Sequence, residues 1–215
     1  MLSRREDCRN TLKKNMSTKR LKNIEVEQIA NLHNKYIDTG FLSTLGIPFL
    51  KLIYQLMNNS NNAFYLIEVE DGKIVGFVSG VISIRGFYKE FFKKNFIKGT
   101  VYLLPKLLKP VTMRKTLETL FYPAKKENDL PDAELLSIVV EENYQGKGVA
   151  RKLFIKLVDE FKTRGVFRFK VVVGSNLIAA CRFYEKMGGV YDSETEVHKG
   201  EKSRVYKWDL MNERS

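Results

Sequence analysis

A glycine-rich turn, QGKGVAR, precedes a segment whose apolar residues recur at helical spacing. Glycine lets the backbone approach a ligand closely. The N-terminus of a helix adds N–H groups without intrahelical partners and the positive end of the helix dipole. A turn of this kind between a strand and a helix is suited to bind phosphate. The residues concerned are Gln145, Gly146, Lys147, Gly148, Val149, Ala150 and Arg151.

Two familiar phosphate motifs do not fit this turn. The P-loop requires Gly-Lys-Ser or Gly-Lys-Thr, whereas Gly148 is followed by Val149 and Ala150. The dinucleotide fingerprint requires a third glycine, and Arg151 stands at that position. The remaining pattern also fits a solvated strand–helix turn, so the surrounding elements must decide between the two interpretations.

The elements around the turn are predicted from hydrophobic periodicity and from turn residues. Asp71-Gly72 predicts a hairpin between two β-branched and aromatic runs. Gly165 is expected to end the helix after the turn, and Ser175 or Asn176 is expected to cap the next helix. We predict helices within 21–37, after Pro48, 149–161 and 175–188, and strands within 63–83, 133–140, 167–174, 190–197 and 203–210.

Two stretches in this order resemble the GNAT superfamily of acyl-CoA-dependent N-acetyltransferases. The first is Q/R-x-x-G-x-G/A, here Gln145 to Ala150. The second is N-x-x-A-x-x-F-Y-E-K-x-G, here Asn176, Ala179 or Ala180, Phe183 to Lys186, and Gly188. The close resemblance covers about residues 130–190, and a looser one covers 19–84 and 190–210.

The resemblance implies an α/β (α+β) fold. Its central sheet is mixed and mostly antiparallel, is splayed between the fourth and fifth strands, and has flanking helices. We expect a basic N-terminal arm at 1–18, followed by a single N-acetyltransferase domain at 19–215 with a helical insert at about 85–128.

The resemblance also implies how acetyl-CoA binds as the acyl donor. The backbone of Ile138, Val139 and Val140 would pair with the pantetheine arm, and the amides of Gln145 to Ala150 would hold the pyrophosphate. Lys147 and Arg151 would assist electrostatically, and Asn176 is counted among the cofactor-binding residues.

Direct transfer to an amine requires a base, an oxyanion donor and an acid for the departing thiolate. The resemblance assigns the acid to Tyr184, which is otherwise a half-buried helix aromatic. Glu134 stands where the histone-acetylating branch has its base, and alternation along the strand places it on the face of Leu136, Ile138 and Val140. A solvated strand-end carboxylate is the other interpretation of Glu134. Cys181 is interpreted as packing and not as a nucleophile.

Composition limits the remaining possibilities. The net charge is +12, and Cys8 and Cys181, far apart, indicate no disulfide framework, so we expect a reducing cytoplasm. His33 and His198 are too few and too scattered for a metal cluster. The first 20 residues lack the apolar region of a signal peptide. The run GFLSTLGIPFLKLIYQLM is interrupted by Gly, Pro and Lys, which favours a buried helix over a membrane span.

The insert at 85–128 holds eleven Lys or Arg against three Glu, with eight interleaved aromatic residues. It is interpreted either as a solvated helical hairpin or as a lid tuned to an anionic acceptor, and peripheral membrane contact is a further possibility. Nucleic-acid binding is not favoured, because no recognised reading motif is present.

The expected function is transfer of an acetyl group to a primary amine, on a small molecule or an amino sugar. A protein lysine or N-terminal acetyltransferase and a non-catalytic acyl-CoA-binding module stay as alternatives. The ribosomal-protein N-terminal acetyltransferases carry a glutamate five residues before the asparagine of the second signature. Val171 stands at that position, which counts against the simple N-terminal reading. The sequence leaves the oligomeric state open.

Overall fold

The computed structural model describes residues 23–37, 45–94, 130–198 and 201–211. Within them, six strands form one sheet in the order β1-β2-β3-β4-β6-β5. β3 and β4 run parallel, and the other neighbouring strands of this sheet are antiparallel. The strands are β1 Ala63–Glu70, β2 Lys73–Val81, β3 Glu134–Val140, β4 Arg168–Gly174, β5 Val190–His198 and β6 Glu201–Asp209. The predicted mixed, mostly antiparallel sheet is confirmed.

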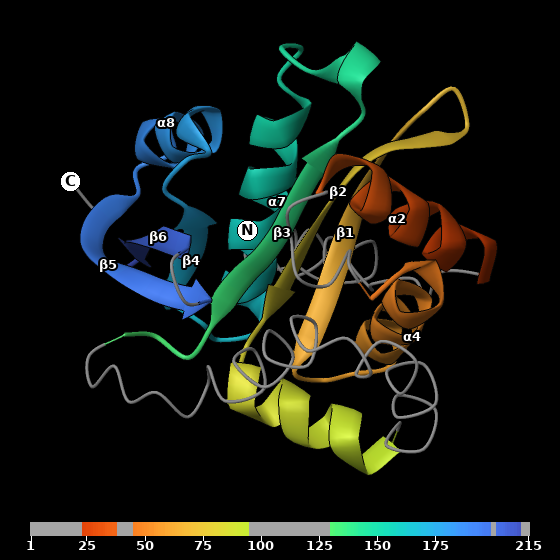
Figure 1. Ribbon diagram of the computed structural model, residues 1–215, viewed down its shortest axis with the longest axis horizontal. Helices are drawn as coiled ribbons and strands as arrows, with labels where there is room; N and C mark the ends of the chain where they lie inside the picture. The colour runs from red at the N-terminus through yellow and green to blue at the C-terminus, as the bar shows by residue number, and fades with distance from the viewer. Residues whose placement is uncertain (1–22, 38–44, 95–129, 199–200, 212–215) are drawn as a thin grey trace, which may run out of the picture.

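Helices cover both faces of this sheet (Figure 1). The labelled helices are α2 Asn23–Tyr36, α4 Ile47–Asn58, α7 Val149–Thr163 and α8 Ile178–Lys186, and residues 84–94 form another helix. α2, α4 and helix 84–94 pack around Phe77 on what we call the α2/α4 face. α7 and α8 pack around Phe154 and Phe169 on the α7/α8 face. The molecule therefore has two apolar cores, one on each side of the sheet.

The β1–β2 hairpin forms where Asp71-Gly72 predicts it. Asp71 has a φ of 50° and Gly72 a φ of 75°, so both central residues of the turn are left-handed. Positive φ at both central residues is the mark of a type I′ turn, whose twist matches that of the two flanking strands. Asp-Gly is one of the preferred pairs in this turn.

The part of the apolar run that follows Gly46 forms α4, a buried helix, as predicted. Pro48 stands in its first turn, where the missing N–H costs nothing because it would have no intrahelical partner. Seven of its twelve residues are buried. Among the helices that the structure describes, none is long and apolar enough to cross a membrane.

A bulge in β3 changes which side chains share a face. Ser79 pairs with Ser137 and Gly80 pairs with Leu135, so Leu136 is an extra residue on β3. A bulge of this kind reverses the alternation of the residues beyond it. Leu136 packs against the α2/α4 core, whereas Ile138 and Val140 pack against the α7/α8 core.

Because of the bulge, the Glu134 side chain lies on the opposite face of the sheet from the one predicted. Glu134 pairs with Val81, a member of the α2/α4 core, and cross-strand partners share a face. Glu134 therefore lies on the α2/α4 face, on the side of Val139. The prediction that it shares a face with Ile138 and Val140 is wrong, because simple alternation does not foresee the extra residue.

β3 and β4 part soon after they begin. They pair at Glu134–Lys170 and Leu135–Val171, and their pairing stops there. β4 stays paired with β6 along its whole length, and β3 stays paired with β2 up to Val140, so the two halves of the sheet diverge between β3 and β4. The predicted splay is confirmed. The two strands are the third and fourth of the described chain, whereas the prediction numbered them fourth and fifth by the count of the superfamily.

The start of α8 differs from its prediction. The helix begins at Ile178 with Leu177 as its N-cap, without a side-chain capping bond, and not with Ser175 or Asn176. The chain first makes a turn in which Leu177 N–H donates to the Gly174 carbonyl at 2.9 Å. Since that turn occupies residues 174–177, the helix cannot begin until it is complete.

The first part of the predicted insert is a packed helix. Ile84, Phe87 and Phe91 of helix 84–94 are buried in the α2/α4 core. Ser83 directly precedes the helix, and its hydroxyl accepts from Gly86 N–H at 2.9 Å and donates to Asp132 at 2.6 Å. Residues 95–128 of the insert and the predicted arm at 1–18 lie outside the described residues.

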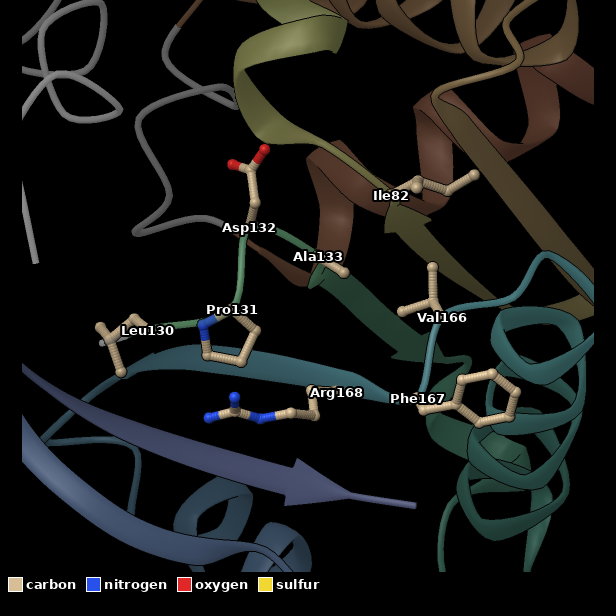
Figure 2. A pocket seen from close by; sticks show the side chains of 8 residues that line it. All are labelled: Ile82, Leu130, Pro131, Asp132, Ala133, Val166, Phe167 and Arg168. Atoms are coloured by element: carbon tan, nitrogen blue, oxygen red, sulfur yellow. The ribbon is translucent and has the colours of Figure 1, made fainter. Parts of the chain in front are cut away.

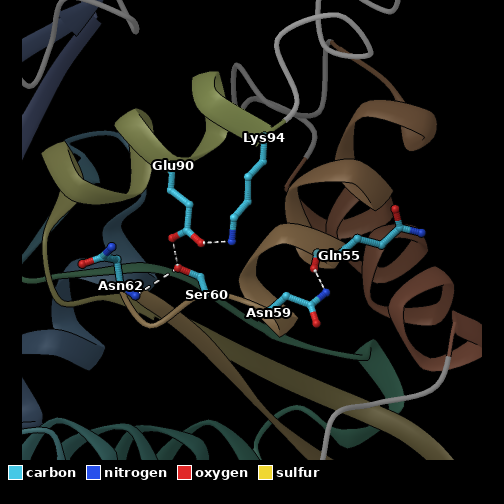
Figure 3. Close-up of polar contacts among 6 residues, drawn as sticks. All are labelled: Gln55, Asn59, Ser60, Asn62, Glu90 and Lys94. Carbon is cyan, nitrogen blue, oxygen red and sulfur yellow. Dashed lines mark hydrogen bonds and ion pairs between the residues drawn. The ribbon is translucent and has the colours of Figure 1, made fainter.

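Helix 84–94 is also tied to the segment between α4 and β1 (Figure 3). Glu90 accepts hydrogen bonds from the Ser60 hydroxyl and, at 2.6 Å, from Lys94. Burial alone would raise the pKa of Glu90, but the bonds from Lys94 and Ser60 outweigh it and lower that pKa. The helix is therefore held at two points and belongs to the core, not to a detached hairpin.

Candidate active site

The glycine-rich turn has a backbone that requires glycine. Gly146 has a φ of 73° and Gly148 a φ of 83°, a region that residues with a Cβ rarely adopt. A Cβ added at either position would have no heavy atom within 4 Å. The two glycines are thus demanded by the backbone conformation and not by packing, and the space beside the turn is open.

α7 begins directly at this turn. Gly148 is its N-cap, and the Gly148 carbonyl accepts from Lys152 N–H at 3.0 Å. The N–H groups of the first helical turn, before Lys152, are those that helix geometry leaves without intrahelical partners. Lys147 and Arg151 are exposed beside them, and Lys147 Nζ lies 5.4 Å from the centre of the Tyr144 ring. The combination suits an anion, and the binding of pyrophosphate at this turn stays a prediction.

The turn is fastened to three neighbouring elements. The Gln145 side-chain amide donates to the Val140 carbonyl at 3.1 Å, which ties the turn to the end of β3. Glu141 N–H donates to the Val75 carbonyl of β2 at 2.8 Å, and Glu142 N–H donates to the Tyr36 hydroxyl of α2 at 3.2 Å. These contacts make the turn a preorganised part of the scaffold.

The predicted strand for the pantetheine arm leads into this turn. Ile138, Val139 and Val140 pair with β2 on one side, and on the other side they have already parted from β4. Val139 is buried, and Ile138 and Val140 are half-buried. The structure therefore places an unpaired strand edge and the glycine-rich turn in succession, and their role in binding a cofactor stays a prediction.

Asn176 lies at the corresponding end of β4. β3 and β4 are parallel, so their carboxyl ends meet at the same edge of the sheet. Asn176 is exposed, and its Oδ1 would lie 2.8 Å from a Cβ added at Gly174. It is thus near the open end of the wedge between the strands, and its cofactor-binding role stays a prediction.

Tyr184 is a buried residue of the α7/α8 core. Its ring centre lies 6.1 Å from that of Trp208 and 6.3 Å from that of Tyr206. Burial raises the pKa of the Tyr184 phenol well above its usual range, and nearby Cys181 contributes in the same direction. The phenol is protonated at neutral pH, as a proton donor must be. Cys181 is itself buried, in agreement with its predicted packing role.

Glu134 stands at the closed end of the wedge. Its side chain is buried against Lys170 of β4, with 3.6 Å between Lys170 Nζ and Glu134 Oε2. The solvated strand-end carboxylate, which was the alternative interpretation, is wrong because Glu134 is 7% exposed. The two predicted catalytic side chains lie on opposite faces of the sheet, Tyr184 on the α7/α8 face and Glu134 on the α2/α4 face.

The sequence reasoning missed a polar pair inside the α2/α4 core. A hydrogen bond of 2.7 Å joins His33 Nδ1 to the Tyr54 hydroxyl, and His33 Nε2 has no partner in the described structure. Burial lowers the pKa of His33 to about 4, so the ring is neutral at pH 7. The signal was present, because His33 follows the buried Ile29 by four residues on one helix face.

A surface hollow of about 420 Å³ lies at the other end of the wedge strands (Figure 2). Six of its eight lining residues are apolar, and Asp132 and Arg168 supply its charged groups. It lies at the start of β3 and β4, away from the glycine turn, so it is not the predicted cofactor site. In the described part of the chain, no three His, Cys, Asp or Glu side chains are grouped to hold a metal ion.

Two curated relatives share a short region with this chain. The [Ribosomal protein bS18]-alanine N-acetyltransferases of Salmonella typhimurium and Escherichia coli are each 37% identical over 59 residues. The match covers 27% of this chain and 40% of each relative. The chain therefore spans about two fifths of the length of the curated relatives it matches.

Solved structures share the fold over most of the chain. An N-acetyltransferase from Staphylococcus aureus Mu50 aligns with a TM-score of 0.57 at 14% identity, covering 88% of this chain and 95% of that one. The PaiA N-acetyltransferase of Thermoplasma acidophilum, solved in complex with coenzyme A, aligns with a TM-score of 0.57 at 13% identity, covering 89% and 96%. At such identities the likeness is one of fold.

A family model describes the same region as one unit. The model of the acetyltransferase (GNAT) family matches residues 28–189, which include most of α2, the parted strands, the glycine turn and Tyr184. That range is more than half of the chain. The chain therefore belongs to the acetyltransferase (GNAT) family.

Proposed function

We propose that this protein is an acetyl-CoA-dependent N-acetyltransferase that moves the acetyl group directly to a primary amine. The single observation that carries the proposal is the parting of β3 from β4 after Leu135, directly before the turn of Gly146 and Gly148. An unpaired strand edge and an anion-binding turn in succession suit a ligand with an extended amide-bearing arm and a pyrophosphate.

The described residues fit that cosubstrate. The backbone of Ile138 to Val140 can pair with the amides of the pantetheine arm as an added strand would. The N–H groups at the start of α7 can hold the pyrophosphate, and a side chain at Gly148 would enter the same open space. The fold neighbour from Thermoplasma acidophilum was solved with coenzyme A, which supports this assignment.

When bound, acetyl-CoA supplies a thioester carbonyl that a neutral amine can attack. Glu134 accepts a proton from the amine as the nitrogen–carbon bond forms, directly or through water. The Tyr184 phenol gives a proton to the sulfur as the carbon–sulfur bond breaks. The products are the N-acetylated amine and the free thiol, and exchange with solvent then removes the proton from Glu134 and restores the one on Tyr184. The opposite placement of the two side chains lets one act at the acceptor and the other at the leaving group.

The proposed acceptor is a small molecule or an amino sugar. Transfer to a protein amine is the second candidate, because the curated relatives are named for acetylation of a ribosomal-protein alanine. Against the simple N-terminal reading stands Val171, at the position where we expect a glutamate in such enzymes. The proposed setting is the reducing cytoplasm.

A thiol-release assay with acetyl-CoA tests this proposal. A panel of amino sugars, polyamines, amino acids, lysine peptides and N-terminal peptides should contain an amine that raises thiol release above the amine-free rate. Mass spectrometry should then find an added acetyl group on that amine. Binding of CoA without transfer to any amine would favour a non-catalytic acyl-CoA-binding module. Absence of CoA binding would contradict the proposal as a whole.

A further inference from the structure

The pair formed by Glu134 and Lys170 joins the two strands at the point where the sheet divides. Glu134 and Lys170 are in register, one of the two positions at which β3 and β4 pair. The next position is Leu135–Val171, and Leu136 is the bulge residue. The pair therefore lies at the apex of the wedge, one residue before the last paired position of the two strands.

Lys170 is fixed by a second contact. Its Nζ donates to the Pro131 carbonyl at 2.7 Å and lies 3.6 Å from Glu134 Oε2. The side chains of Lys170 and Glu134 are 8% and 9% exposed. The hydrogen bond to the backbone carbonyl and the burial of the side chain keep the Lys170 ammonium group from turning out into solvent. Its charge therefore stays beside the Glu134 carboxylate.

The described surroundings of Glu134 contain a third titratable group. This group is Tyr88 of helix 84–94. Burial raises the pKa of its phenol, and the negative charge of Glu134 raises it further. Tyr88 packs against the same core as Leu136. Asp132, two residues before Glu134, is turned to the Ser83 hydroxyl. Lys170 is thus the cation that β4 contributes, whereas Tyr88 is a neutral group that the start of the insert contributes.

We propose that Lys170 is a positioning residue for Glu134, holding its carboxylate charged and fixed at the apex of the wedge. This inference rests on the proposed function, in which Glu134 takes the proton of the acceptor amine. A neighbouring cation favours the charged form of a carboxyl group, and a contact from the facing strand limits its rotation. β4 therefore takes part in the acceptor chemistry although it is not the strand that carries the base.

The consequence can be measured in the pH–rate profile. A base works only in its deprotonated form, so the rate falls on the acidic side as Glu134 takes up a proton. Loss of the neighbouring cation makes protonation easier and moves that acidic limb to higher pH, by about 1 pH unit or more. A residue with a merely structural role would lower the rate at all pH values without moving the limb.

The experiment compares kcat at saturating acetyl-CoA and acceptor against pH in four variants, because kcat/KM would also report protonation of the free amine. Lys170→Gln removes the charge, but its amide can still donate to the Pro131 carbonyl, which favours folding. Lys170→Arg keeps the charge. Lys207→Gln is the matched control, because Lys207 is the register partner of Lys170 on β6 and is paired with Asp192 at 2.5 Å. Glu134→Gln tests the base itself.

We expect the acidic limb to move in Lys170→Gln, and to stay in place in Lys170→Arg and Lys207→Gln. Glu134→Gln should remove the limb. If Glu134→Gln removes the limb but Lys170→Gln leaves it in place, the positioning role of Lys170 is wrong and the proposed base stands. If Glu134→Gln leaves the limb in place, the base assignment in the proposed function is wrong.

Discussion

At the scale of residues, Gly148 and Gly165 stand at opposite ends of α7 with the same backbone requirement. Their φ values are 83° and 75°, and a Cβ added at either would meet no heavy atom within 4 Å. A substitution therefore strains both ends alike. What distinguishes them is their surroundings, because Gly148 adjoins the anion-binding turn and Gly165 ends the helix.

This symmetry gives a matched test of the turn. Gly148→Glu should weaken CoA binding at least tenfold, or about 1.4 kcal/mol, because a carboxylate would oppose the pyrophosphate. A glutamate at a helix N-terminus is favourable for the helix itself, so folding should survive. Gly165→Glu should leave the affinity unchanged. Calorimetric titration with CoA measures both, and equal affinities in the two folded variants would refute the assignment of the turn.

Tyr184 offers a second test, of the chemistry rather than of binding. Tyr184→Phe removes the phenolic proton and keeps the ring that packs on Trp208. We expect kcat to fall about 100-fold, the lower end of general acid catalysis, with little change in CoA affinity. Steady-state kinetics with the acceptor found in the thiol-release assay measures this. An unchanged kcat would mean that the thiolate leaves without help from Tyr184.

His33 predicts how the stability of the fold depends on pH. Its pKa is lowered by burial from 6.5 to about 4, so between these values the unfolded chain binds the proton and the folded chain does not. Stability is therefore highest above pH 6.5 and is lost as the pH falls towards 4, by roughly 3 kcal/mol when complete. In His33→Gln this part of the loss should vanish. Urea unfolding of both proteins at pH 4.5 and 7 measures the difference, and parallel losses would contradict the prediction.

At the scale of elements, the bulge in β3 and helix 84–94 together shape the α2/α4 face, which is the proposed acceptor side. The bulge at Leu136 turns Glu134 to the α2/α4 face, and helix 84–94 covers that face near Asp132. The basic character of the insert begins on this helix. Lys94 is paired with Glu90, so it is a poor choice for testing recognition, whereas Lys93 is exposed.

Lys93→Glu tests whether the helix attracts an anionic acceptor. We expect the acceptor KM to rise about threefold at low salt and the salt dependence of KM to flatten, because exposed charges are screened over roughly 10 Å. CoA affinity should not change. Lys202→Glu on β6 is the control with the same change of net charge. If the two variants have the same acceptor KM, the charge of helix 84–94 has no part in recognition.

Much of the element order was predictable from local sequence signals. The exceptions depend on how a segment pairs or turns in the folded chain, which the local sequence does not show. Asp71-Gly72, Gly165 and the alternation in β1 and β2 are local signals, and the structure follows them. The bulge at Leu136 was not predictable, because it depends on the pairing of β3 with β2. The late start of α8 was missed because Ser175 and Asn176 are residue types that often cap helices. In the structure they lie within the turn of residues 174–177, and the helix begins after it.

At the scale of the whole molecule, the sheet separates the face where we expect the cosubstrate from the face where we expect the acceptor. The α7/α8 face holds Tyr184, and the glycine turn leads into α7, so we expect the cosubstrate there. The α2/α4 face holds Glu134, the His33–Tyr54 pair and helix 84–94, so we expect the acceptor there. The signatures in the sequence predicted the turn, strand and helix that form the first side, and the binding roles of their residues stay predictions. The second side was less predictable, since Lys170 and Tyr88 reach Glu134 from distant parts of the chain.

Hydrogen–deuterium exchange with and without CoA tests the central claim most directly. The account predicts slower exchange in peptides that cover Ile138 to Val140 and Gly146 to Arg151, because these amides would bind the pantetheine arm and the pyrophosphate. A peptide across the Asp71-Gly72 hairpin should exchange equally in both conditions. Protection confined to the hollow lined by Asp132 and Arg168, with none at the glycine turn, would contradict the account.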